Sequence, residues 1–262
     1  MRRFLTFLFI LSVLFYSCEK ELPVTGDLIV EGYLYANRPF DSIRIGEAIP
    51  TGKPLELKPI INADAEISTD NQSYKLTGLQ GHPGVYRYQG SDFIIEPGIS
   101  YTLSVSIGNR KLTAWTSVPV KSSGPKFSKD TIYSSGNNNP ESVALSYSIL
   151  TWDPVTEYSF IIRKYLNTDS AIIDSNSLNS YVPYYLQKPF NGNIVSMQIY
   201  DFRYFGSYNI IICQVNKEFE QLLNQSSGIE NPIIPQENIS GGYGIFTGIY
   251  CDTVKLKILR GK

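Results

Sequence analysis

The sequence predicts an all-β protein, and three observations support this prediction. Tyr, Ile, Val, Thr and Ser are abundant, with 19 Tyr residues against two Met, and such usage favours strands over helices. Apolar and polar residues alternate strictly from Ile99 to Ile107, as they do in a half-buried antiparallel strand. Glu96-Pro97-Gly98, just before this run, has Pro and Gly where a type II turn needs them.

The first predicted domain, residues 28–120, is a β-sandwich of immunoglobulin or transthyretin type. Several short strands follow one another with regular turns, among them the two-residue hairpin signal Gly108-Asn109. The strand after this hairpin has one inward face, formed by Leu112, Ala114, Thr116 and Val118. The predicted strands are Leu28–Tyr35, Asp41–Ile45, Ala63–Ser68, Gln72–Thr77, Gly84–Gln89, Ile99–Ile107 and Lys111–Val118.

Residues 121–139 are polar and rich in Ser, Gly and Asn, which predicts a linker with a short strand at Thr131–Tyr133. Residues 140–262 form a second β-rich domain with one short helix near 216–227. Asn216 suits the start of that helix, and Val215, Phe219, Leu222 and Leu223 share one of its faces. The predicted strands are Ser142–Trp152, Glu157–Leu166, Ile194–Tyr204, Ser207–Val215 and Thr253–Leu259.

Residues 1–17 have the pattern of a secretory signal peptide, with Arg2 and Arg3 ahead of an apolar run. The run is shorter than the ~20 residues that a membrane-spanning helix needs. It ends in Ser17-Cys18, which resembles the lipobox of bacterial lipoproteins, where the Cys thiol is acylated and becomes the mature amino terminus. We therefore expect residues 18–27 to be a lipidated Cys and its tether. The alternative is an ordinary signal peptide that ends in an unmodified Cys.

The charge of the chain gives no sign of a nucleic-acid partner. Without Arg2 and Arg3 the formal charge is −3, from 21 basic and 24 acidic residues, and no Lys or Arg cluster is present. The sequence also predicts no cofactor.

Cys213 and Cys251 are the two other cysteines, and both lie in strand-like runs. In an oxidising compartment they form a candidate disulfide. Two buried free thiols are the alternative that the sequence leaves open.

The sequence predicts a protein that is not an enzyme and holds no metal. His82 is the only histidine and lies in a Gly-Pro loop, so neither a Ser-His-Asp triad nor a histidine metal site is expected. The polar stretch 167–180 lacks the spacing of a calcium loop. Glycoside hydrolysis needs only two carboxylates, and four acidic residues are available for this less favoured alternative, namely Asp153, Glu157, Asp201 and Asp252.

Aromatic residues gather in two neighbouring segments of the second domain. The candidate ligand-binding side chains are Tyr181, Tyr184, Tyr185 and Tyr204. Exposed tyrosines supply rigid, amphipathic area for stacking on a glycan or a peptide. Ordinary packing against the sandwich is the alternative.

The order of several motifs resembles a family of uncharacterised Bacteroidota outer-membrane lipoproteins, the domain-of-unknown-function 4249 family. These motifs are Cys-Glu-Lys from Cys18, LIVEGYL from Leu28, EPGISYTLSVSIGNRKLTAWTSVP from Glu96, KEFEQLLNQ from Lys217 and NISGGYGIF from Asn238. The resemblance implies a surface lipoprotein, often encoded beside a TonB-dependent outer-membrane transporter, and it offers no catalytic residues. The Gly-rich part of the last motif, Gly241 to Gly244, lacks the setting of a phosphate loop and indicates positive φ or close backbone approach.

Taken together, these features lead us to expect a lipid-anchored outer-membrane protein that faces the cell exterior. The acidic cluster Glu19-Lys20-Glu21 resembles the export signal of such lipoproteins, although a solvated tether would have the same composition. The expected role is a non-catalytic binding or accessory component beside a TonB-dependent transporter, with a glycan or a peptide as ligand. A surface adhesin is the main alternative, and a glycan hydrolase is the other.

Overall fold

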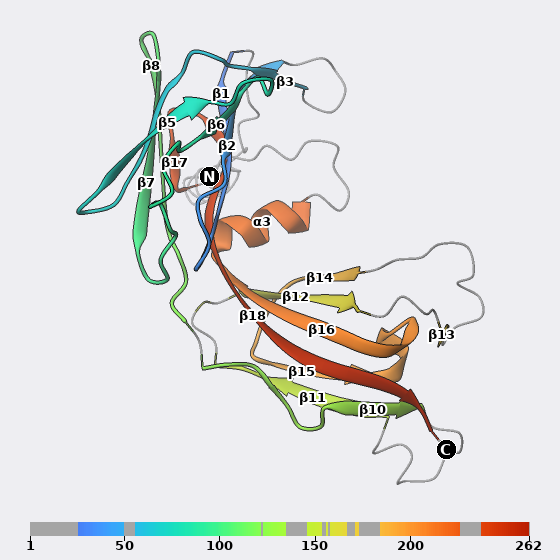
Figure 1. Cartoon of the computed structure of the whole chain (residues 1–262). Coiled ribbons are helices and arrows are strands. Elements are labelled where there is room, and N and C mark those ends of the chain that lie inside the picture. Colours follow the sequence, from blue (N-terminus) through green and yellow to red (C-terminus); the bar gives the residue numbers. More distant parts are fainter. Residues whose placement is uncertain are drawn as a thin grey trace, which may run out of the picture.

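The longest strand of the chain, β18 (Tyr243–Arg260), runs through both halves of the molecule in a computed structural model (Figure 1). One end of β18 belongs to an N-terminal sandwich and the other end to a C-terminal sandwich. The structure describes residues 26–49, 56–121, 123–134, 146–153, 156, 158–166, 171–172, 184–225 and 237–261. The prediction of an all-β protein with a short helix is confirmed.

The N-terminal sandwich is built from β1 to β8, which occur in the spatial order β1-β2-β6-β5-β4-β7-β8, with β3 paired to β2. The predicted alternation is confirmed on β7, where Tyr101, Leu103 and Val105 are buried. Gly98 has a φ of +80°, as the predicted turn before β7 requires. The strands are β1 (Leu28–Tyr35), β2 (Ile43–Ile49), β3 (Glu56–Pro59), β4 (Asp64–Ser68), β5 (Ser73–Gly78), β6 (Val85–Arg87), β7 (Ser100–Ile107) and β8 (Arg110–Ser117).

Residues from the end of the chain complete this first sandwich, which differs from the predicted domain boundaries. The predicted C-terminal domain, 140–262, includes β17 (Ile239–Ser240), which pairs with β8, and the first part of β18, which pairs in parallel with β1. The predicted last strand began only at Thr253, ten residues after the observed start of β18. The difference arises because glycines at 241, 242 and 244 weaken the strand signal in the sequence.

Two of these glycines are required by close backbone contact. Gly244 has a φ of +121°, and a Cβ atom there would lie 1.9 Å from the carbonyl oxygen of Val30. Gly241 has a φ of +79°, and its Cβ would lie 2.1 Å from the carbonyl oxygen of Lys111. Glycine therefore lets the chain cross from β8 to β1 where no side chain fits, which confirms the interpretation of positive φ and close approach.

Asn238 fixes the start of this crossing. Its side-chain Nδ2 donates to the carbonyl oxygens of Trp115, at 2.7 Å, and Phe246, at 2.8 Å. The backbone nitrogen of Trp115 donates in return to the carbonyl oxygen of Asn238, at 3.0 Å. One residue thus ties β8 to β18 ahead of the glycines.

The C-terminal sandwich packs a large sheet, β14-β12-β16-β18 with β10 beside β18, against the small sheet β15-β11-β9. Its core lies between the two sheets and includes Leu150, Ile161, Ile210 and Leu256. The strands are β9 (Lys126–Phe127), β10 (Thr131–Ser134), β11 (Tyr147–Thr151), β12 (Tyr158–Tyr165), β13 (Ala171–Ile172), β14 (Tyr184–Asn191), β15 (Ile194–Gln198) and β16 (Tyr204–Val215), with a 3₁₀ turn η2 (Ile199–Asp201).

Three details of this half differ from the sequence-based expectations. The predicted linker, 121–139, contributes β9 and β10, and both belong to the second sandwich. The predicted strand Ile194–Tyr204 is interrupted by η2. No strand was predicted between Leu166 and Ile194, but residues 184–191 form β14. This edge strand tolerates Pro189 because the register with its partner shifts between Ser159 and Ile161.

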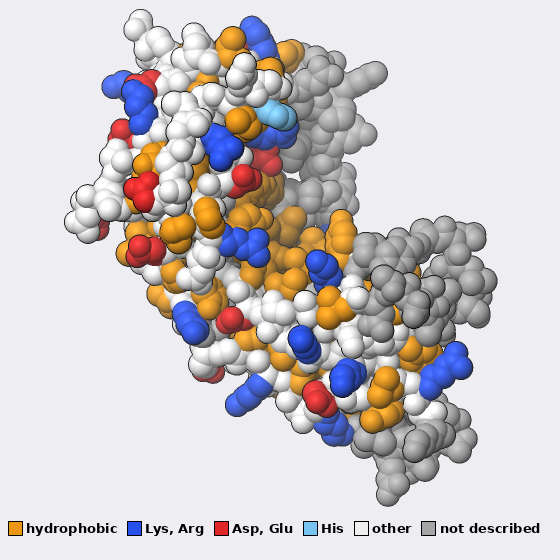
Figure 2. Space-filling model, in the orientation of Figure 1, with side chains coloured by type: hydrophobic (Ala, Val, Ile, Leu, Met, Phe, Trp, Pro, Cys, Tyr) orange, Lys and Arg blue, Asp and Glu red, His pale blue; other side chains and the backbone are white. Residues whose placement is uncertain are grey.

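The predicted helix is present as α3 (Lys217–Gln225) and links the two sandwiches. Phe219 stacks on Phe160 of β12, with ring centroids 5.2 Å apart, and meets Tyr33 of β1 edge-on at 6.2 Å. Asn216 precedes the helix, and its Nδ2 donates to Thr116 Oγ1 and to the carbonyl oxygen of Ser117. Hydrophobic side chains gather in the hollow between the sandwiches, where α3 lies (Figures 1 and 2). Within the described residues, no helix has the length and apolar character needed to cross a bilayer.

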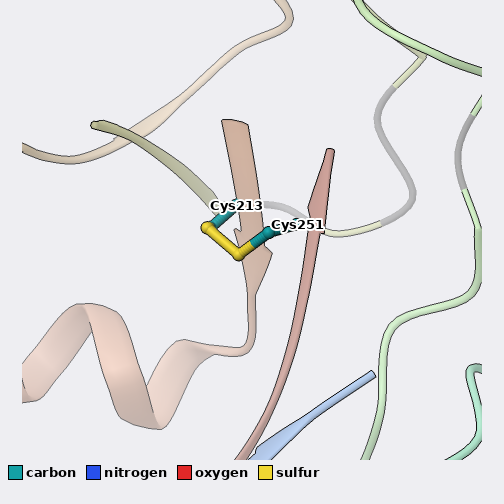
Figure 3. Close-up of a disulfide and its surroundings, with 2 residues drawn as sticks. All are labelled: Cys213 and Cys251. Atoms are coloured by element: carbon teal, nitrogen blue, oxygen red, sulfur yellow. A yellow bond between two sulfur atoms is a disulfide. The ribbon is translucent and has the colours of Figure 1, made fainter. Parts of the chain in front are cut away.

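Cys213 and Cys251 are joined by a disulfide between β16 and β18 (Figure 3). The two residues are direct partners in the antiparallel register, and they contribute to the same hydrophobic cluster as Phe219 of α3. The bridge therefore fixes the register of the two longest strands at the point where β18 passes from one sandwich to the other.

We predict that replacing both Cys213 and Cys251 with Ala lowers the free energy of unfolding by about 3 to 4 kcal/mol, because the bridge closes a loop between residues 38 apart. Urea denaturation of the oxidised protein and of the double variant measures this difference. Reduced wild-type protein is the control and should match the variant. A loss below about 1 kcal/mol would show that the bridge constrains little in the unfolded chain.

Candidate functional site

A pocket of about 250 Å³ opens at one end of the large C-terminal sheet, and we call it the tyrosine pocket. It lies where β12 ends and where β14 and β16 begin, three strands that are neighbours in the sheet (Figure 1). Seven aromatic and three charged side chains line it, and six of the seven aromatic ones are Tyr. The pocket therefore combines ring faces, hydroxyls and charge in a small volume.

The floor of the tyrosine pocket is a packed cluster of buried rings. Tyr165 stacks on Tyr204 with centroids 4.8 Å apart and contacts Tyr208 at 5.1 Å. The Tyr208 hydroxyl donates to the carbonyl oxygen of Tyr204, at 2.9 Å, and accepts from its backbone N–H, at 3.0 Å. Burial raises the pKa of Tyr208 well above its ordinary value, so this hydroxyl stays protonated at physiological pH. These bonds fix the turn that opens β16.

Arg163 of β12 is the central charge of the pocket and is only 8% exposed. Its Nη1 lies 3.2 Å from Oδ1 of Asp201, and its guanidinium lies 4.3 Å from the ring centroid of Tyr185. The ring centroid of Phe202 also lies near the guanidinium, 5.8 Å from its Cζ. The Nε–H group is buried and has no hydrogen-bond acceptor in the described part of the chain. A buried guanidinium with an unused donor is costly unless a further acceptor completes it.

Asp201 is held in place independently of Arg163. Its Oδ2 accepts a hydrogen bond from the backbone nitrogen of Gln198, at 2.8 Å, which closes the first turn of η2. The carboxylate therefore offers one oxygen to Arg163 and commits the other to the backbone.

The rim of the pocket carries three exposed tyrosines. Tyr184 is 60% exposed, Tyr185 is 55% exposed and Tyr200 is 87% exposed. Arg203 is also exposed and lines the pocket beside them. Solvent-facing rings beside a buried cation have the character of a binding surface, since they bury area on a ligand at little entropic cost.

The sequence-predicted aromatics have three different outcomes. Tyr184 and Tyr185 lie together at the rim, whereas Tyr181 lies outside the described residues. The expectation that Tyr204 is exposed is wrong, because this side chain is 5% exposed and packs into the floor of the pocket, which it lines. Its position on β16 faces the sandwich core, as do Tyr208 and Ile210, four and six strand positions further on.

Sequence reasoning missed Arg163, and it placed Tyr200 in the second aromatic segment without selecting it as a candidate binding residue. Arg163 was detectable, since it falls between Ile161 and Tyr165 on the inward side of an alternating strand, where an unpaired charge is unexpected. Tyr200 carries no such signal, because its exposure depends on the 3₁₀ turn.

Among the described residues, the remaining candidates are not brought together in a second site. His82 is exposed in its loop, and Cys18 lies outside the described residues. Asp201 lines the tyrosine pocket, Asp153 is exposed elsewhere, Asp252 is half-buried on β18, and Glu157 lies outside the described residues. No group of three or more His, Cys, Asp or Glu side chains with the geometry of a metal site occurs among the residues that the structure describes.

We predict that Tyr204→Ala lowers the free energy of unfolding by about 3 to 5 kcal/mol, the usual cost of emptying a buried aromatic site. Tyr184→Ala is the matched control and should change stability by less than about 0.5 kcal/mol, because its ring faces solvent. Urea denaturation of both variants tests the division of the pocket into floor and rim. Equal losses in the two variants would contradict it.

Comparison with known proteins identifies a family but no characterised relative. The family model described as "Domain of unknown function (DUF4249)" matches residues 16–253. No curated protein sequence matches this chain. The crystal structure of chicken CNTN1 FN1–FN3 domains matches with 14% identity and a TM-score of 0.31, covering 92% of this chain and 69% of that one. The crystal structure of DIP-gamma IG1+IG2 matches with 9% identity and a TM-score of 0.19, covering 90% and 99%.

Proposed function

Since this chain belongs to the DUF4249 family, a domain of unknown function, we propose that it is a non-catalytic binding component of a bacterial outer-membrane surface. The observation that carries the proposal is the tyrosine pocket. Three exposed rings, Tyr184, Tyr185 and Tyr200, surround a buried Arg163 that has an unused donor. Such a surface is built to hold a ligand by stacking and by charge.

The proposed anchor is an acylated Cys18. Support comes from the sequence alone, in which an apolar segment that follows Arg2 and Arg3 ends at Ser17-Cys18. Several acyl chains hold a protein at a bilayer without a spanning helix, since each buried methylene contributes about 0.8 kcal/mol. The tether that follows leaves the sandwiches free to face the medium.

The proposed partner is a TonB-dependent transporter of a Bacteroidota outer membrane. This part of the proposal rests on the resemblance in motif order from Cys18 to Phe246. In this role the pocket collects a ligand, which the transporter then takes up.

A hydrolase is the less favoured function because of the carboxylates in the pocket. Glycoside hydrolysis requires two carboxyl groups, about 5 to 9 Å apart. Asp201 is the only acidic residue among the described residues that line the tyrosine pocket, and it is already paired with Arg163. The pocket therefore suits binding better than bond cleavage.

We predict that the tagged lipoprotein, solubilised gently from native outer membranes, brings down a TonB-dependent transporter in stoichiometric amount. Mass spectrometry of the purified complex identifies the partner. A variant with Tyr184→Ala and Tyr185→Ala should retain the transporter, because docking and ligand binding use separate surfaces. Cys18→Ser should lose membrane association, which tests the anchor separately.

Recovery of the intact lipoprotein from outer membranes without any transporter would contradict the accessory role. Self-association or binding to other cells would then favour an adhesin.

A further inference from the structure

We propose that the ligand of the tyrosine pocket is a saccharide that carries a carboxylate, such as a uronic acid residue. Arg163 and Arg203 receive the carboxylate, and the rim tyrosines contact the sugar ring. This inference rests on the proposed binding function and specifies the class of ligand.

The first argument is the unused bonding capacity of Arg163. A guanidinium has five N–H donors in a planar fork that fits a carboxylate. The described structure gives Arg163 one ion-pair contact with Asp201, at 3.2 Å, and leaves its buried Nε–H without an acceptor. Asp201 does not supply this acceptor, since its Oδ2 accepts from the backbone nitrogen of Gln198, at 2.8 Å, while the Arg163 Nε–H has no partner among the described residues. An acceptor from outside the chain therefore completes the cluster.

The second argument is the charge of the pocket. Among the described residues, Arg163 and Arg203 line it together with a single carboxylate, Asp201, which leaves one positive charge over. Burial strengthens the attraction of this excess charge for an anion, since the guanidinium lies in a medium of lower dielectric constant than water. An anionic ligand neutralises this excess positive charge.

The third argument is the chemistry of the lining. Within the described part of the chain, every apolar side chain that lines the pocket is aromatic. Sites for small molecules are lined by hydrophobic and aromatic side chains with a few placed polar groups. Flat rings bearing hydroxyls suit a ring-shaped, polyhydroxylated ligand, which stacks on one face and exchanges hydrogen bonds at its edge.

Tyr185 controls access to the cation. Its ring covers the guanidinium of Arg163 from the cross-strand position on β14, yet more than half of this side chain is exposed. A rotamer change at such a surface side chain is fast, on the picosecond to nanosecond scale. The carboxylate thus reaches Arg163 once Tyr185 turns aside and stacks on the sugar.

The test is calorimetric titration of the detergent-solubilised full-length protein with acidic oligosaccharides and their neutral methyl esters. Oligosaccharides of galacturonate, of glucuronate and of mannuronate are the three probes. We expect at least one of them to bind about ten- to a hundredfold more tightly than its ester, because the ester removes a charge-assisted hydrogen bond. Raising the salt concentration should weaken binding of the acid and leave binding of the ester unchanged.

Substitutions at two positions, Arg203 and Arg163, assign the selectivity to the pocket. Arg203→Gln, at an exposed position, should reduce the preference for the acid several-fold without affecting the fold. Arg163→Gln should abolish the preference, and Arg163→Lys should restore part of it, since Lys keeps the charge but not the fork. Arg87→Gln, at an exposed position on β6, is the control and should leave binding of acid and ester unchanged.

Each other outcome overturns the inference in a distinct way. Equal binding of acid and ester, lost in Tyr184→Ala, would leave the proposed binding function intact and refute the role of the carboxylate. Binding of none of the three acids would refute the ligand class, whereas the proposed function would still be judged by the recovery of a transporter from membranes. Binding of a carboxylate-bearing peptide in place of every saccharide would likewise overturn it.

Discussion

The parallel pairing of β18 with β1 is the contact on which the rest of the structure depends. Residues 243 to 249 of β18 lie beside residues 29 to 35 of β1, more than 200 positions earlier in the chain. The next residues of the same strand pair with β16 from Ile249 to Ile258. One strand therefore closes the first sandwich and forms the middle of the large sheet of the second. The glycines at 241 and 244 allow this pairing, because the backbone at the start of β18 passes where a Cβ atom would collide with carbonyl oxygens.

This arrangement connects the fold to the candidate site. The disulfide sets Cys213 opposite Cys251, so β16 holds a fixed register on β18, and β12 pairs with β16 over eight residues. Arg163 and Tyr165 thereby come to lie beside Ile210 and Tyr208 at the far end of the sheet. Helix α3 covers the opposite face of the same sheet near the first sandwich. The tyrosine pocket is thus carried on strands that are braced by both halves of the molecule, and its geometry is rigid in the floor and adaptable at the rim.

Such a topology also has consequences for folding. Pairing between the two ends of a chain is slow, because a large loop must close before the contact forms. The first sandwich stays incomplete until the last residues are available, since β17 and β18 supply strands to both of its edges. A chain that folds only once its synthesis is complete meets this requirement.

Much of the fold was predictable from local patterns, and the rest depends on long-range contacts. The alternation around Leu103 and Ala114 identified β7, β8 and their buried faces, because each strand has one face in the core and one face toward solvent. The first residues of β18 were missed because glycine has a low strand propensity, and the close backbone contacts that require glycine there are not visible in the sequence. Pro189 weakens the strand signal of the edge strand β14. Tyr204 faces inward because it lies on the same face of β16 as Tyr208 and Ile210. Tyr184 and Tyr185 of the rim were found from the clustering of aromatic residues. Arg163 beneath them was overlooked, although its place on the inward side of an alternating strand is visible in the sequence.

The most direct test of this account is native-state hydrogen exchange along β18. If the strand joins the two sandwiches into one cooperative unit, amides at 245 to 249 and at 253 to 258 should exchange with one common free energy. That value should equal the free energy of global unfolding measured with denaturant. Exchange of one half of β18 at a clearly lower free energy, while the other half stays protected, would show two independent sandwiches and contradict the account.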